Sequence, residues 1–146
     1  MVDPAFLLTF LEKNILLVVV CAASGAMLIW PSLGRFFTGG APEIGAHEVV
    51  QLINRREAVV LDVRDEAEYT TAHIPNARHI PDRELKARLK ELDKFKNRPI
   101  VVSCKGGLRA TGTVSLLRKS GFKEVFALRG GVAAWQQASM PVEKGT

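Results

Sequence analysis

Cysteine is scarce in this 146-residue sequence, whose two cysteines are Cys21, inside a hydrophobic run, and Cys104, in a polar stretch. Thiols in such different surroundings are poor candidates for a disulfide. No C-x-x-C pair and no Cys/His cluster occurs, so a structural zinc site is not expected, and we expect neither a metal nor a cofactor. Internal repeats and low-complexity tracts are also missing, which argues against a repeat architecture.

Aromatic residues are sparse as well, at 7% of the chain, although the formal net charge is +5. Because the positive charge lacks interleaved aromatics or a known motif, we expect no nucleic-acid partner. The most basic segment is "RELKARLKELDKFKNR", with seven basic residues against three acidic ones. We interpret it as a solvated amphipathic helix, with steering of an anionic substrate or contact with anionic lipid as alternatives.

Charge is absent from the run "ILLVVVCAASGAMLIW", residues 15–30. As a helix it covers roughly 24 Å, and extension to residue 33 approaches the roughly 30 Å of a hydrocarbon core. We therefore predict an N-terminal transmembrane helix, with a lipid bilayer as its partner. Trp30, Phe36 and Phe37 would form an interfacial belt, and Arg35 would reach the headgroups.

A cleaved signal peptide is the alternative for this run, with Ser24, Gly25 and Ala26 as the cleavage site. Acidic residues before the run and apolar residues after Ala26 count against it. The domain that follows is basic, which favours a single-pass protein with that domain in the cytoplasm. The expected organisation is a tail at 1–14, a transmembrane helix at 15–33, a linker at 34–43 and one domain at 44–146.

Short apolar runs alternate with segments of helical period in the domain. The expected strands cover residues 58–63, 99–103 and 124–128, with weaker ones at 43–44 and 77–80. The expected helices cover residues 46–54, 83–92, 108–120 and 132–138. Near-continuous apolar strands separated by helices predict an α/β fold with a parallel sheet covered on both faces.

Cys104 follows the third main strand and precedes a helix, in the stretch "VVSCKGGLRATG". Ligands of parallel α/β sheets bind beyond the carboxyl ends of the strands, so the thiol is expected at the functional edge. The glycine pair allows successive N–H groups to converge on an anion, and the helix dipole and two cations add to this. Such a setting favours the thiolate, which is the nucleophilic form of cysteine. We predict Cys104 as a nucleophile, with its anion-binding loop formed by Lys105, Gly106, Gly107, Leu108 and Arg109.

This loop resembles the C-x-x-G-x-R motif of single-domain rhodaneses, the sulfurtransferase family. Upstream, "VLDVRDEAEYTTAHIPNARHIP" resembles the family's D-V-R...E-(F/Y)...G-H-I-P-G-A segment, and downstream "LRGGVAAW" with Pro141 resembles its closing segment. The resemblance covers residues 43–143. Ala72, Asn76 and Ser139 stand where glycines are usual, and none of them touches the loop.

The resemblance implies a rhodanese-like three-layer domain, with a central parallel sheet flanked by helices, and an arrangement similar to that of bacterial inner-membrane rhodanese-like proteins. It further implies that Cys104 takes sulfur from a donor such as thiosulfate as a persulfide, and passes it to a thiol or cyanide. The persulfide is anionic, so the groups that stabilise the thiolate also stabilise it.

Other motif residues are expected to have supporting roles. We assign Asp62 and Arg64 to the support of the site, and predict a structural ion pair between Arg64 and Glu68. His73 is expected to shape a turn. The remaining expectations are a close approach to the loop for Gly130 and Gly131, and a packing role for Trp135.

Two other functions compete with sulfur transfer. Cys-dependent phosphatases of similar fold have a C-x5-R loop, and the shorter C-x4-R loop here fits one sulfur atom better than a phosphoryl group. The chain could instead be a membrane-tethered interaction or sulfur-delivery module that acts on a protein partner, such as a membrane protein. An intact Cys104 loop favours catalysis.

Overall fold

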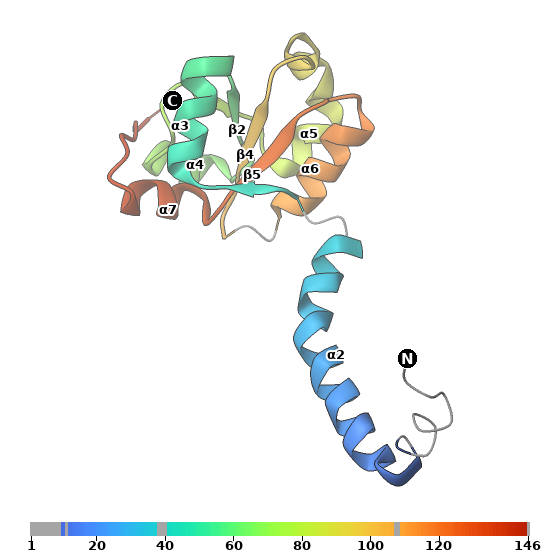
Figure 1. Cartoon of the computed structure of the whole chain (residues 1–146). Coiled ribbons are helices and arrows are strands. Elements are labelled where there is room, and N and C mark those ends of the chain that lie inside the picture. Colours follow the sequence, from blue (N-terminus) through green and yellow to red (C-terminus); the bar gives the residue numbers. More distant parts are fainter. Residues whose placement is uncertain (1–9, 11, 38–40, 107–108, 146) are drawn as a thin grey trace. The chain divides into compact units, whose positions relative to one another are not determined.

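A computed structural model describes residues 10, 12–37, 41–106 and 109–145, with the side chains of residues 28–37 outside the description. The chain forms two compact units, Met1–Gly40 and Ala41–Thr146. Figure 1 labels helix α2 of the first unit and most helices and strands of the second.

The N-terminal unit contains helix α2, Ile15–Phe37. Its described side chains include exposed large hydrophobics at Ile15, Leu16, Leu17, Val19, Val20 and Met27. Within the described part of the chain, no helix is both long and apolar enough to cross a membrane. The predicted belt of Trp30, Arg35, Phe36 and Phe37 lies outside the described side chains. The membrane span therefore stays a prediction.

The second unit is built on a sheet of five parallel strands in the order β1-β5-β4-β2-β3. Every residue of β2 and β4 is buried, which explains why these strands appear in the sequence as nearly continuous apolar runs. The five predicted strands are confirmed with small shifts of their ends. Their bounds are β1 Glu43–Ile44, β2 Val59–Asp62, β3 Arg78–His79, β4 Ile100–Ser103 and β5 Val125–Leu128.

Helices cover both faces of this sheet, with α3, α4 and α7 on one face and α5 and α6 on the other (Figure 1). Neighbouring residues of β4 point to opposite faces, since Val101 packs in the core on the α3 and α7 side and Val102 in the other core. The predicted three-layer α/β domain is confirmed. The helix bounds are α3 Ala46–Arg56, α4 Glu66–Thr71, α5 Asp82–Arg88, α6 Ala110–Lys119 and α7 Gly131–Gln137.

Two helical segments differ from the prediction. The helix expected at residues 83–92 ends at Arg88, and a 3₁₀ helix, η1 Leu89–Phe95, continues from it and buries Leu92 and Phe95. Helix α4 was not predicted, because it has no buried residue and hence no apolar stripe. Acidic residues in its first turn favour the helix through the dipole instead.

Candidate functional site

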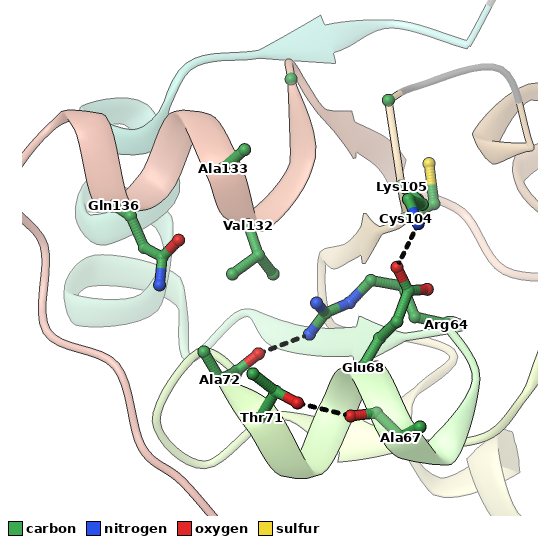
Figure 2. Close-up of a pocket in the computed structure, with 12 residues that line it drawn as sticks. Arg64, Ala67, Glu68, Thr71, Ala72, Cys104, Lys105, Val132, Ala133 and Gln136 are labelled. Carbon is green, nitrogen blue, oxygen red and sulfur yellow. Dashed lines mark hydrogen bonds and ion pairs between the residues drawn. The ribbon is translucent and has the colours of Figure 1, made fainter.

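Three loops that follow β2, β4 and β5 meet at the carboxyl edge of the sheet. Between them lies a pocket of about 420 Å³ (Figure 2). The β2 loop and α4 contribute Arg64 and Glu68, the β4 loop contributes Cys104, and the β5 loop and α7 contribute Gly130 and Val132. This is the edge at which ligands of parallel α/β sheets bind.

Cys104 directly follows the central strand β4 and is buried, with 1% of its surface exposed. A small molecule must therefore use the pocket that Cys104 lines to approach this residue. Gly106 adopts a φ of 67°, a left-handed conformation that glycine accepts without strain, and so allows the backbone to turn after the cysteine. The predicted loop residues Gly107 and Leu108 lie outside the described residues.

Gly131 holds the backbone of Cys104 at very close range. A Cβ on Gly131 would overlap the carbonyl oxygen of Cys104, and the φ of 60° at Gly131 also favours glycine. The predicted close approach to the loop is thus confirmed for Gly131, whereas a Cβ on Gly130 would meet Ala134 in α7 and not the loop. The start of α7 and the cysteine are consequently fixed relative to each other.

Asp62 and Arg64 form a buried ion pair beneath the pocket. The Arg64 Nη2 donates to Asp62 Oδ2 at 2.6 Å and to the carbonyl oxygen of Ala72 at 2.8 Å, and Nε donates to Asp62 Oδ1 at 2.9 Å. Asp62 is fully buried and Arg64 is 9% exposed. The pair ties the end of β2 to the end of α4, so both predicted supporting residues lie at the site.

The predicted ion pair between Arg64 and Glu68 is wrong. Arg64 turns to Asp62 because the chain bends after β2, where the backbone N–H of Arg64 also donates to Asp62 Oδ1 at 3.1 Å. Glu68 reaches from α4 toward the β4 loop and accepts from Lys105 Nζ at 2.9 Å (Figure 2). Glu68 is therefore a pocket residue that the sequence analysis missed, although its place in the E-(F/Y) motif was a signal.

The two predicted loop cations are placed differently from each other. Lys105 lines the pocket but is paired with Glu68, and 77% of its side chain is exposed. Arg109 occupies the N-cap position of α6 without a side-chain capping bond, is exposed, and is not among the described residues that line the pocket. Neither side chain supplies the pocket with an unbalanced positive charge.

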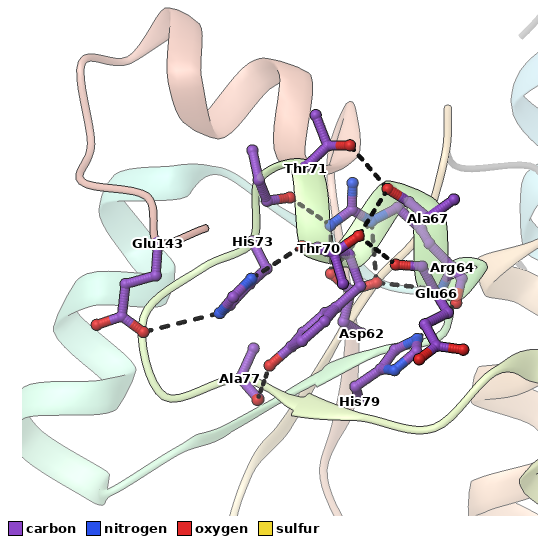
Figure 3. Close-up of polar contacts among 12 residues, drawn as sticks. Asp62, Arg64, Glu66, Ala67, Thr70, Thr71, His73, Ala77, His79 and Glu143 are labelled. Carbon is purple, nitrogen blue, oxygen red and sulfur yellow. Dashed lines mark hydrogen bonds and ion pairs between the residues drawn. The ribbon is translucent and has the colours of Figure 1, made fainter. Parts of the chain in front are cut away.

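An aromatic stack lies beside the Asp62–Arg64 pair. The Tyr69 ring stacks on His73 at 3.9 Å and on His79 at 4.3 Å between ring centroids. His73 Nδ1 bonds the carbonyl oxygen of Tyr69, and its Nε2 lies 3.7 Å from a Glu143 carboxylate oxygen (Figure 3). Burial, followed by the negative charge of Asp62, raises the pKa of the Tyr69 phenol.

His73 has a structural place in this stack, in agreement with the prediction that it shapes a turn. Its backbone pairs with that of Glu143 in an isolated antiparallel bridge, which fastens the C-terminal segment to the end of α4. Trp135 is buried and donates from Nε1 to the carbonyl oxygen of Pro141, so its predicted packing role is confirmed. Among the described residues, no group of three or more His, Cys, Asp or Glu side chains could hold a metal ion.

Comparison with known proteins identifies related sequences. A family model described as "Rhodanese-like domain" matches residues 45–138. Protein YibN of Escherichia coli (strain K12) is 34% identical over 99 residues, which cover 67% of this chain and 69% of YibN. "Thiosulfate sulfurtransferase GlpE" of Actinobacillus pleuropneumoniae is 30% identical over 101 residues, covering 69% of this chain and 92% of the relative.

Solved structures share the fold of the second unit. The Alr3790 protein from Anabaena sp. superposes with a TM-score of 0.63 at 32% identity, covering 70% of this chain and 92% of that chain. "Thiosulfate sulfurtransferase from Pseudomonas aeruginosa" gives a TM-score of 0.65 at 30% identity, covering 72% of this chain and 20% of that much longer chain.

Proposed function

Because the chain belongs to the rhodanese-like domain family, we propose that it is a sulfurtransferase in which Cys104 carries the transferred sulfur. One observation carries the proposal: Cys104 follows the central strand and lines a pocket built by three loops of the catalytic edge. Two relatives named thiosulfate sulfurtransferase support sulfur transfer as the type of reaction.

The reaction proceeds by two displacements on sulfur. The Cys104 thiolate attacks the outer sulfur of a donor such as thiosulfate, the S–S bond of the donor breaks, and sulfite leaves with the electron pair. The persulfide on Cys104 then gives its outer sulfur to cyanide or to a thiolate, and the Cys104 thiolate is restored. Covalent catalysis of this type divides one difficult transfer into two easier steps.

The fold supplies stabilisation for the anionic thiolate and persulfide. Helix α6 begins at Ala110, six residues after Cys104, with its positive dipole end at the β4 loop. The close contact at Gly131 restricts the backbone that carries the thiol. Cys104 is the one cysteine between residues 41 and 146. The domain has no second thiol that could take the sulfur, so the acceptor thiol comes from outside the domain.

A turnover assay tests this proposal. The full-length chain in detergent is mixed with thiosulfate and cyanide, and thiocyanate is measured over time. We expect turnover by the wild type, none by Cys104→Ser and unchanged turnover by Cys21→Ser, since Cys21 lies in the N-terminal helix. Equal rates for Cys104→Ser and wild type would refute the assignment of Cys104.

A membrane-tethered delivery module is the second candidate. The observation that favours it is the row of exposed large hydrophobics on α2, for which a lipid bilayer is the matching environment. In this function the chain is a single-pass protein of the inner membrane, its domain lies in the cytoplasm, and a membrane protein receives the sulfur with little turnover of small donors.

Cell fractionation and a fusion test this second function. The chain is expected in the membrane fraction after alkaline carbonate extraction, and a Leu17→Lys/Val19→Lys double variant is expected to be released. A reporter fused after Thr146 should be active in the cytoplasm. Release of the wild-type chain by carbonate would contradict the anchor, and a reporter active only outside the cytoplasm would contradict the orientation.

A further inference from the structure

The charges that line the Cys104 pocket cancel. The charged lining residues are Arg64, Glu68 and Lys105. Asp62 balances Arg64 from below, and Glu68 balances Lys105 at the rim. Since Arg109 does not line the pocket, the described side chains around it carry no excess positive charge that would concentrate a dianion.

Small apolar groups make up much of the remaining surface. Along α4 and the residue that follows it, and along α7, the pocket is lined by the apolar side chains of Ala67, Ala72, Val132 and Ala133. The polar Thr71 and Gln136 lie among them. The methyl and isopropyl groups match the hydrocarbon part of an organic molecule better than the hydrated oxygens of a doubly charged ion.

Arg64 keeps one donor group for a ligand. Its Nε and Nη2 are used by Asp62 and Ala72, whereas Nη1 has no hydrogen-bond partner among the described residues. Arg64 lines the pocket, so this N–H pair is available to an oxygen of a bound donor. One donor group of this kind suits one sulfonyl oxygen and not a second negative charge.

Glu68 determines the net charge of the pocket, and with it the preference between singly and doubly charged donors. Its carboxylate accepts hydrogen bonds and donates none, and 29% of its side chain is exposed, so its charge is only partly screened by solvent. It also withdraws Lys105 from any anionic donor. A neutral side chain at this position would leave Lys105 unpaired and the pocket with a net positive charge.

We infer that Glu68 is a specificity-determining residue, which makes the site prefer singly charged organic sulfur donors of the thiosulfonate class to dianionic thiosulfate. The inference rests on the proposed sulfur transfer. In the preferred reaction, the Cys104 thiolate attacks the outer sulfur of R–SO₂–S⁻ and forms the persulfide anion. The S–S bond of the donor breaks, and the sulfinate R–SO₂⁻ leaves with the electron pair.

Two donors of nearly equal shape test the charge preference. Methanethiosulfonate carries a methyl group where thiosulfate has one of its oxygens, and has one negative charge fewer. We measure kcat/KM for both donors with the full-length chain, using cyanide as acceptor. The kcat/KM for thiosulfate divided by that for methanethiosulfonate should rise roughly three- to tenfold in Glu68→Gln. The same ratio should fall by a similar factor in Lys105→Gln. The double variant, neutral at both positions, should return close to the wild-type ratio.

The dependence on ionic strength and a matched control variant distinguish an electrostatic effect of Glu68→Gln from a structural one. The ratio for Glu68→Gln should decline as ionic strength rises, because the new attraction is electrostatic, whereas the wild-type ratio should stay nearly constant. Glu124→Gln removes the same charge from an exposed pair with Arg56 that does not line the pocket, and should leave the ratio unchanged.

The outcomes distinguish failure of this inference from failure of the proposed sulfur transfer on which it rests. If neither donor loads the wild-type chain, the proposed sulfur transfer fails, and the inference fails with it. If both donors are used and Glu68→Gln leaves their ratio unchanged, sulfur transfer stands and the role of Glu68 is refuted. Lys105→Gln is an independent test, since the exposed Lys105 side chain is not needed for folding. An unchanged donor ratio in this variant would also refute the role of the Glu68–Lys105 pair.

Discussion

Gly131 packs so closely on Cys104 that no side chain at Gly131 fits beside the Cys104 carbonyl oxygen. The contact joins two loops from neighbouring strands, β5 and β4, and fixes the backbone of the residue that we propose as nucleophile. The position of the thiol thus depends on a glycine 27 residues later in the chain.

Gly131→Ala should therefore damage both stability and sulfur transfer. The added methyl overlaps a backbone oxygen at a positive φ, so we expect a loss of about 2 kcal/mol or more in the free energy of unfolding. A displaced nucleophile should lower kcat/KM by roughly 100-fold. Urea denaturation and the thiocyanate assay measure the two effects.

Gly112→Ala is the matched control for this substitution. Gly112 lies inside α6, and a Cβ there meets open space. The variant should gain about 0.5–1 kcal/mol of stability from helix propensity. If Gly131→Ala were as well tolerated, the close contact would have no energetic importance.

Asp62→Asn should be strongly destabilising. It leaves the guanidinium of Arg64 buried without a counter-charge, a change that costs about 3–5 kcal/mol in comparable buried pairs. We expect the midpoint of thermal unfolding to fall by many degrees in calorimetry. Glu84→Gln, which breaks an exposed pair with Arg88, is the control and should change the midpoint little.

Tyr69→Phe should show an effect that depends on pH. At neutral pH the variant loses the hydrogen bond from the phenol to the carbonyl oxygen of Ala77, which is worth about 1 kcal/mol. The pKa of Tyr69 is raised by burial, so the folded state keeps the phenol proton at a pH where the unfolded chain releases it. The associated stability is complete below about pH 10 and is lost as pH rises through the folded pKa.

The difference in stability between wild type and Tyr69→Phe should accordingly narrow above about pH 10. Chemical denaturation at a series of pH values measures it. A difference that widens with rising pH would mean that the phenol ionises more easily in the folded protein than in the unfolded chain.

The sheet was predictable because its strands are buried on both faces. In β2 and β4 every residue is buried and all but the last residue of each strand are apolar, so these apolar runs predict strands from the sequence. The place of Cys104 followed from this, since the carboxyl end of a parallel strand is the functional edge. Helix α4 gave no such signal, because its sequence EAEYTT buries no residue.

The polar partners around the site were harder to predict than the strands. The pairing of Arg64 with Asp62 could not be predicted with the strand rule, because Arg64 lies in a bend after β2, and Glu68 was another carboxylate nearby in the sequence. The pairing of Glu68 with Lys105 joins α4 to the β4 loop, and only the three-dimensional meeting of these segments determines it.

The most direct test of the account is the location of the transferred sulfur. The full-length chain is incubated with thiosulfate, its intact mass is recorded, and the modified cysteine is identified by peptide mass spectrometry, with Cys104→Ser and Cys21→Ser beside it. We predict a gain of one sulfur atom on Cys104, retained in Cys21→Ser, absent in Cys104→Ser and discharged by cyanide. Loading that persists in Cys104→Ser, or a wild-type chain that gains no sulfur from thiosulfate or methanethiosulfonate, would contradict the assignment of Cys104 as the sulfur carrier.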